Sequence, residues 1–282
     1  MAGFFGLFNY EKEGPGIRKD GPKKKTFIIF FETFFRNFWK FIPINLFYAL
    51  LSLPVLTGGF ASAGMTNVTR NIARDKHSFG ISDFWDTVRK NWKQALGLGI
   101  LRVISFALLG FSFRFYAFQV GGIGSTIGVG ICLSLFFIFS VMNFYLWTLL
   151  ITFKFSVKQM LANSFRFVFL NLGRNILCGV ILLLCEAAYI AIPFLFFHPL
   201  VIFFETMFFF CTFPAFRYLL IQFCTFPSIK KYIIDPYYKE HPGEDIERRR
   251  DLGLEVEDPN QSDEEEDSQE DEDDPNAPVF ED

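Results

Sequence analysis

Residues 53–64 read LPVLTGGFASAG and interrupt an apolar run that extends over residues 41–65. Pro54 lacks a backbone hydrogen-bond donor, and Gly58 and Gly59 tolerate backbone conformations that other residues avoid. The small residues that follow permit a neighbouring helix to approach closely. We therefore predict a helix that ends near Leu53, a break over residues 54–59, and a shorter helix that returns toward the side from which the first one came.

Beyond this break the apolar residues form four long blocks. These are residues 95–116, 123–153, 176–197 and 200–223 of a 282-residue chain that is 51% hydrophobic and contains 41 Phe. A helix needs about 20 apolar residues to cross the ~30 Å hydrocarbon core of a bilayer, whereas a helix on a soluble protein would show a polar face. The sequence predicts an all-α integral membrane protein: a helix bundle with two transmembrane hairpins, plus an N-terminal span or re-entrant hairpin.

Lys and Arg are distributed unevenly around these blocks. Of the 27 basic residues, 24 fall within residues 1–40, 70–93, 154–174 and 230–250, whereas the turns near Gly121 and His198 carry none. Because cytoplasmic loops are enriched in Lys and Arg, we expect the four basic segments and both termini on the cytoplasmic side of the cell membrane. The count favours a re-entrant first hairpin; the alternative is one N-terminal span with the N-terminus outside.

Composition divides the chain into four parts. We expect a basic cytoplasmic segment at residues 1–25, the membrane bundle with its interfacial helices at 26–228, a second basic cytoplasmic segment at 229–250, and a tail at 251–282. The tail holds 16 of the 30 acidic residues and no Lys or Arg. Such a self-repelling sequence with few apolar residues is expected to be disordered.

Amphipathic segments link the predicted membrane helices, at residues 27–41, 81–93 and 157–174. In residues 81–93 the aromatic side chains share one face and the basic ones occupy the rest, a set that comprises Phe84, Trp85, Arg89, Lys90, Trp92 and Lys93. This pattern is typical of a helix that lies on an anionic inner leaflet, and a helix that docks on a cytoplasmic partner has the same pattern.

A weak internal repeat aligns residues 84–101 with residues 165–182. Each copy precedes two predicted spans, so the chain would contain two units that each consist of an amphipathic helix and two spans. Parallel repeats of this kind are common in transporters.

Ionisable residues inside the spans are the candidate functional residues, because burial of charge in hydrocarbon is costly. Counted along the helices, Arg102 and Glu186 fall in one layer of the membrane, and Arg114 and Glu205 in another. Two such ion pairs would form a polar pathway or a substrate-binding seam. The alternative is that they fix the register of the helices.

The sequence contains no motif of an enzyme or a metal centre. It lacks GxSxG and HExxH, and its five Cys and three His do not show the spacing of a zinc site. The Gly-rich stretch at residues 121–130 is not followed by the Lys of a Walker motif, so we predict that it packs helices. We expect no catalytic residue, no cofactor, no bound metal and no nucleic-acid partner.

Four stretches of the sequence resemble the YesL-like family of bacterial membrane proteins, a domain of unknown function. They are GLFNYEKEGPGIRKDGPKKK (6–25), FFRNFWKFIPINLFYALLSLPVLTGGFASAGM (34–65), DFWDTVRKNWKQALGLGI (83–100) and YYKEHP (237–242). Family members usually show Gly-Pro just after the break, where this chain has Gly58-Gly59-Phe60.

The genes of that family often neighbour those of carbohydrate ABC importers. By association, the resemblance implies an accessory protein of carbohydrate uptake that works beside importer subunits. The alternatives are a transporter that uses the Arg and Glu pairs itself, and a membrane enzyme.

Overall fold

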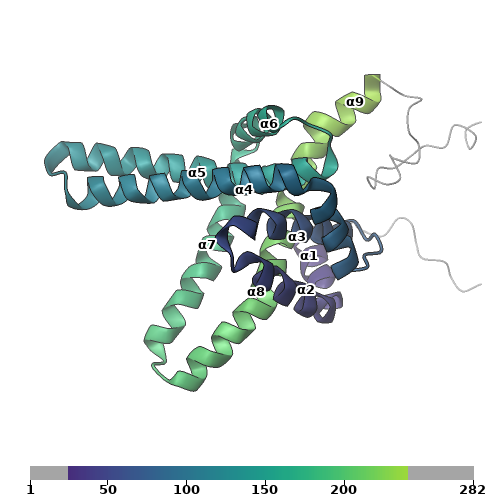
Figure 1. Ribbon diagram of the computed structural model, residues 1–282, viewed down its shortest axis with the longest axis horizontal. Helices are drawn as coiled ribbons and strands as arrows, with labels where there is room; N and C mark the ends of the chain where they lie inside the picture. Colours follow the sequence, from purple (N-terminus) through teal and green to yellow (C-terminus); the bar gives the residue numbers. More distant parts are fainter. Residues whose placement is uncertain (1–24, 241–282) are drawn as a thin grey trace, which may run out of the picture. The chain divides into compact units, whose positions relative to one another are not determined.

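The computed structural model describes residues 25–240, and all regular elements in that part of the chain are helical (Figure 1). The α-helices are α1 (Thr26–Arg36), α2 (Phe38–Ser52), α3 (Gly58–Ala73), α4 (Ile81–Phe118), α5 (Gly122–Thr152), α6 (Val157–Leu170), α7 (Leu172–Leu195), α8 (Pro199–Ile229) and α9 (Asp235–Glu240). A 3₁₀ turn, Val55–Thr57, precedes α3, and a π-helical turn, Lys230–Ile234, precedes α9. The predicted acidic tail and nearly all of the predicted N-terminal basic segment lie outside the described residues.

Four of the described helices, α4, α5, α7 and α8, are long and apolar enough to cross a membrane. The predicted all-α membrane class is therefore confirmed. The contacts divide the chain into two units, one that ends at Cys224 and one that begins at Thr225. The second unit contains the end of α8, the π-helical turn and α9, and in it the Lys231 amine lies 5.3 Å from the centre of the Tyr232 ring.

The first apolar run folds as a short helical hairpin made of α2 and α3. With 15 residues, α2 is about 22 Å long and does not reach across a ~30 Å hydrocarbon core. The chain leaves α2 at Ser52, and the hydroxyl of Thr57 closes the turn by donating to the carbonyl oxygens of Leu51 and Pro54. The break therefore occupies residues 53–57, and Gly58 and Gly59 form the first turn of α3 instead of part of the break.

The helix α3 lies at the centre of the first unit, where it contacts α1, α2, α4 and α5. Small side chains allow this, and the closest approach is between Gly59 and α4. A Cβ atom on Gly59 would lie 2.2 Å from the Ala95 carbonyl oxygen and 2.9 Å from the Cα of Gly99. The small residues after the break thus serve close helix packing.

Residues 81–93 are not a separate interfacial helix; they are the first turns of α4, which runs unbroken for 38 residues. No Pro or Gly interrupts its first turns, and at about 57 Å it is longer than the hydrocarbon core is thick. Phe84 is fully buried, with its ring 5.1 Å from that of Phe47. Trp85 and Trp92 are exposed, and Arg89 and Lys93 lie over their rings at 5.4 and 5.6 Å.

In contrast, α6 is a separate amphipathic helix. It begins with a capping box in which the Ser156 and Gln159 side chains bond each other's backbone amides. It ends at Leu170, and Asn175 of α7 donates to the carbonyl oxygens of Phe167 and Val168 at 2.9 and 3.1 Å. Asn175 thereby satisfies backbone acceptors that the end of a helix leaves open.

The buried residues of α4 recur in α6 and α7 at a spacing of 80 residues along the chain, whereas the sequence comparison predicted a spacing of 81. The buried residues Phe84, Thr87, Val88, Ala95 and Leu98 of α4 correspond to Ser164, Phe167, Val168, Asn175 and Cys178 of α6 and α7. The residue types differ at most of these positions, so a comparison by residue identity selected a register one residue away. The two copies differ in that the second is broken between α6 and α7.

Candidate functional site

Polar side chains from four helices meet at Ser62, which is buried in α3. Its hydroxyl donates to the Gly58 carbonyl oxygen at 2.7 Å and accepts from Arg102 of α4 at 2.9 Å and from the Tyr218 hydroxyl of α8 at 2.8 Å. The Tyr48 hydroxyl of α2 lies 3.4 Å from that of Tyr218. We call these residues, with Trp147 and Asn143 of α5, the Arg102 cluster. It joins α2, α3, α4, α5 and α8.

The charge of Arg102 is stabilised by neutral groups. Its guanidinium carbon lies 5.3 Å from the centre of the Trp147 ring, within the range of a cation–π interaction. Among residues 25–240 no carboxylate forms an ion pair with it. A cavity of about 70 Å³ adjoins the cluster, lined by Arg102, Phe106, Ser140, Asn143, Phe144, Trp147, Arg217, Tyr218 and Ile221.

The structure pairs Glu186 with Arg217, not with Arg102. An Nη atom of Arg217 in α8 lies 3.3 Å from a carboxylate oxygen of Glu186 in α7, and both side chains are partly exposed. Position along a helix gave the depth of these residues but not the direction in which each side chain points. Arg102 points toward α3 and α5, so it does not reach α7.

The second predicted pair, Arg114 with Glu205, is likewise absent from the described part of the chain. Arg114 is exposed on α4, and both carboxylate oxygens of Glu205 in α8 are buried without a hydrogen-bond partner among residues 25–240. The structure therefore does not bring these two residues together, and the predicted polar pathway of two ion-pair layers is not formed.

Exchange of the two charges between Glu186 and Arg217 tests the observed pair. Glu186→Arg or Arg217→Glu alone places two like charges together in an apolar setting, and we expect each to lower stability by about 2 kcal/mol. The double exchange should recover most of that loss. Thermal unfolding of the purified protein in detergent measures it, and the exchange of Arg102 with Glu186 is the control. Recovery in the control but not in the Glu186 and Arg217 exchange would contradict the observed pairing.

One polar contact outside the predicted set is made by Asn45 of α2, which is fully buried. Its side-chain nitrogen donates to the Cys211 carbonyl oxygen at 2.6 Å, and its side-chain oxygen accepts from the Ala215 amide at 2.8 Å. In a regular helix these two backbone groups would bond each other. Asn45 is thus inserted into the backbone ladder of α8, next to Pro214. An Asn in an apolar run was the only signal of this contact in the sequence.

Comparison with known proteins adds a family assignment. Residues 41–113 match the family described as "Protein of unknown function, DUF624". The matched residues cover most of α2, the break, α3 and most of α4, and so include the contact of Gly59 with Gly99 and the bond of Arg102 with Ser62. No curated protein and no solved structure matches the chain. Residues 41–113 are thus similar to the DUF624 family, and this match is consistent with the resemblance to the YesL-like proteins, which are members of that family.

Proposed function

We propose that the protein is a non-enzymatic, multi-pass protein of the cell membrane that assists carbohydrate uptake as an accessory protein of an ABC importer. The observation that carries this proposal is the outer surface of α6. Phe165 and Phe169 are 47% and 56% exposed there, next to the exposed cations Lys158 and Arg166. An amphipathic helix with this composition suits a partner helix or a membrane surface.

An apolar groove adjoins this surface and adds to its capacity to bind a partner. It has a volume of about 440 Å³ and is lined by Leu133, Ser134, Phe137, Ile138, Val168, Phe169 and Leu172 of α5, α6 and α7. Phe169 belongs to both the groove and the exposed surface of α6. A hydrophobic helix of an importer subunit could lie in the groove while its acidic residues meet Lys158 and Arg166.

The alternative function, transport by the protein itself, requires a polar pocket between the spans. The cavity at the Arg102 cluster, about 70 Å³, is well below the ≈ 300–1,000 Å³ typical of ligand pockets. The groove beside α6 is large enough but almost entirely apolar, which does not suit a sugar. Both features favour the accessory role over transport.

The proposed orientation follows the distribution of positive charge. The loops before and after α6 belong to the basic segment at residues 154–174, whereas the turns at Gly121 and His198 lack Lys and Arg. By the tendency of Lys and Arg to remain in the cytoplasm, α6 and both termini lie on the cytoplasmic side. There α6 would face the part of an importer where the ATPase subunits bind.

The test is co-purification of importer subunits in a mild detergent, quantified by mass spectrometry. We expect Phe165→Ser with Phe169→Ser to weaken binding at least about a hundredfold and so to remove most of the importer subunits recovered per protein, because burial of each Phe contributes about 1.5–3 kcal/mol to binding and about 1.4 kcal/mol corresponds to a factor of ten. Phe27→Ser with Phe35→Ser is the matched control, since these residues of α1 are 70% and 65% exposed. Equal losses in both variants, or no importer subunit with the wild-type protein, would refute the proposal.

A further inference from the structure

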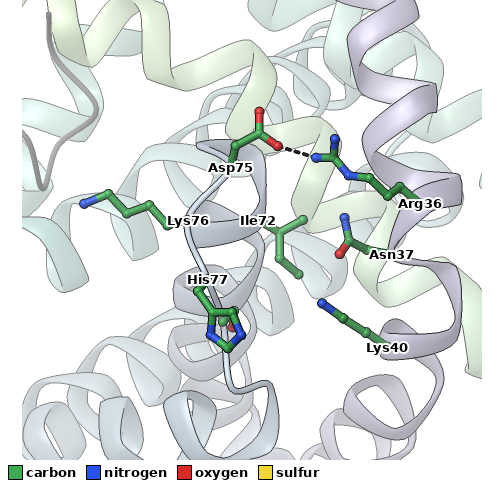
Figure 2. A pocket seen from close by; sticks show the side chains of 8 residues that line it. Arg36, Asn37, Lys40, Ile72, Asp75, Lys76 and His77 are labelled. Carbon is green, nitrogen blue, oxygen red and sulfur yellow. Dashed lines mark hydrogen bonds and ion pairs between the residues drawn. The ribbon is translucent and has the colours of Figure 1, made fainter. Parts of the chain in front are cut away.

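A cavity of about 300 Å³ lies where the α1–α2 junction faces the loop between α3 and α4 (Figure 2). It is lined by Arg36, Asn37, Lys40, Ile72, Asp75, Lys76, His77 and Ser78. Three of these side chains are cationic at neutral pH and only one is a carboxylate. The lining thus holds more basic than acidic side chains, and the cavity is separate from the Arg102 cluster and from α6.

The cations reach the cavity from different elements. Arg36, the last residue of α1, extends across to Asp75 and pairs with its carboxylate. Figure 2 shows that Lys40, in the first turn of α2, points toward the loop that carries His77, whereas the Lys76 amine extends away from the others. Arg36 and Lys40 are thus the two cations placed to meet a ligand from one side of the cavity.

The loop on the other side is held in a fixed shape. Asp75 has a left-handed backbone with φ of 52°, and the amides of Asp75 and Lys76 donate to the carbonyl oxygens of Ile72 and Asn71 at 3.1 and 2.9 Å. These are the two bonds of a Schellman motif at the end of α3. At the other end of the loop, the Asp83 carboxylate accepts from the Phe79 amide and the Ser78 hydroxyl, both at 2.9 Å. Because this loop is already ordered, a ligand that binds in the cavity loses little free energy to the ordering of the chain.

Two further arginines stand at the end of α3, just before the loop: Arg70 lies in its last turn and Arg74 is its C-cap. Burial, and then the nearby charge of Arg70, lower the pKa of Arg74 to about 9, so this guanidinium is still protonated at pH 7.

Exposed aromatic residues lie next to the cavity in the sequence. Trp39 precedes Lys40 and Phe79 follows Ser78, and both are exposed. Aromatic residues of this kind are enriched where a membrane protein meets the lipid head groups. At that level the available anions are the phosphate groups of lipids and phosphate compounds dissolved in the adjacent water.

We infer that this cavity binds a phosphate-bearing anion through Arg36 and Lys40, and that Asp75 competes with the anion for Arg36. Arg and Lys are the side chains that bind phosphate oxygens most strongly, Arg through two parallel hydrogen bonds. When the anion binds, its oxygens take over the Arg36 guanidinium and the Asp75 carboxylate turns toward solvent. The ligand is either a lipid head group or a soluble phosphate, and both share this chemistry.

The full-length protein, purified in a phosphate-free maltoside detergent, serves for the test. Thermal unfolding is measured during titration with inorganic phosphate, and separately with phosphatidylglycerol added to the micelles, each at constant ionic strength. A ligand that binds only the folded state raises the melting temperature as its concentration exceeds the Kd. A rise with phosphatidylglycerol alone identifies a lipid head group, and a rise with inorganic phosphate identifies a soluble ligand.

Four variants connect the effect to the cavity. Arg36→Ala and Lys40→Ala should each weaken binding about tenfold, and Asp75→Asn, which tolerates the same left-handed backbone, should strengthen it. Lys90→Ala removes an exposed cation of α4 that does not line the cavity and should leave binding unchanged. Absence of any rise in both titrations, or an equal loss in Lys90→Ala and Lys40→Ala, would overturn the inference. Melting temperatures without ligand show whether each variant is folded.

Discussion

Replacement of Gly59 by Ala is expected to destabilise the protein by about 3 kcal/mol, although it adds a single methyl group. The added Cβ would lie 2.2 Å from the Ala95 carbonyl oxygen, and this backbone atom cannot move away as a flexible side chain could. The helices α3 and α4 would have to separate, and the bond between Arg102 and Ser62 spans the same interface. Denaturation of the purified protein in mixed detergent micelles measures the change.

Gly97→Ala is the matched control, because it lies on the same helix as Gly99 but a Cβ there would meet no atom within 4 Å. In the interior of a helix, Ala is more stable than Gly by roughly 0.5–1 kcal/mol. We therefore expect Gly97→Ala to leave the protein unchanged or slightly more stable. If Gly59→Ala behaved in the same way, α3 and α4 would not be packed as closely as described.

Replacement of Asn45 by Leu is expected to cost about 2 kcal/mol. The change removes both partners of a backbone amide and a backbone carbonyl in α8, and each buried group left without a partner costs about 1–3 kcal/mol. Part of the loss is recovered because α8 can straighten and form its own bond between Ala215 and Cys211. Insertion of a side chain into the backbone ladder is an established cause of helix kinks.

The same denaturation experiment measures this loss, with Asn163→Leu as the control. Asn163 lies on α6, and among residues 25–240 its side chain accepts a hydrogen bond from Arg166 of the same helix. The control should stay within about 0.5 kcal/mol of the wild type, as surface substitutions usually do. A loss no larger for Asn45→Leu than for Asn163→Leu would show that Asn45 does not support α8.

The positions of the four described membrane helices and of the first turn could be read from the sequence. Four apolar blocks are long enough to be spans. Pro54 favours the end of a helix, because it lacks a backbone donor and its ring clashes with the preceding turn. Residues 81–93 were harder to interpret, because their amphipathic pattern is the same whether they form a separate helix or the start of a longer one. The absence of Pro and Gly in the first turns of α4 was the available clue to a continuous helix.

The partners of the polar residues could not be predicted. The helices α5 and α8 carry mostly apolar residues on every face, so their sequences do not show which face packs against the protein. A helix with a polar face reveals which side faces the protein, but a helix in lipid is apolar on both its lipid and its protein side. The depth of each residue in the membrane therefore predicted that Arg102 pairs with Glu186. In the structure, the side chains point in other directions, and Glu186 pairs with Arg217 while Arg102 bonds to Ser62. The repeat was placed one residue away from its structural register for a different reason, because the residue types at the corresponding buried positions mostly differ.

The central claim is that α2 and α3 form a hairpin that returns to the side it came from, while the other two hairpins cross the membrane fully. Reporter fusions after Lys76, Gly121, Lys154 and His198, each assayed for alkaline phosphatase activity and for green fluorescence in bacterial cells, test it directly. We predict fluorescence after Lys76 and Lys154, and phosphatase activity after Gly121 and His198. Phosphatase activity after Lys76, or labelling of a Cys added at the N-terminus by a membrane-impermeant thiol reagent in intact cells, would contradict the claim, because the first apolar run would then cross the membrane.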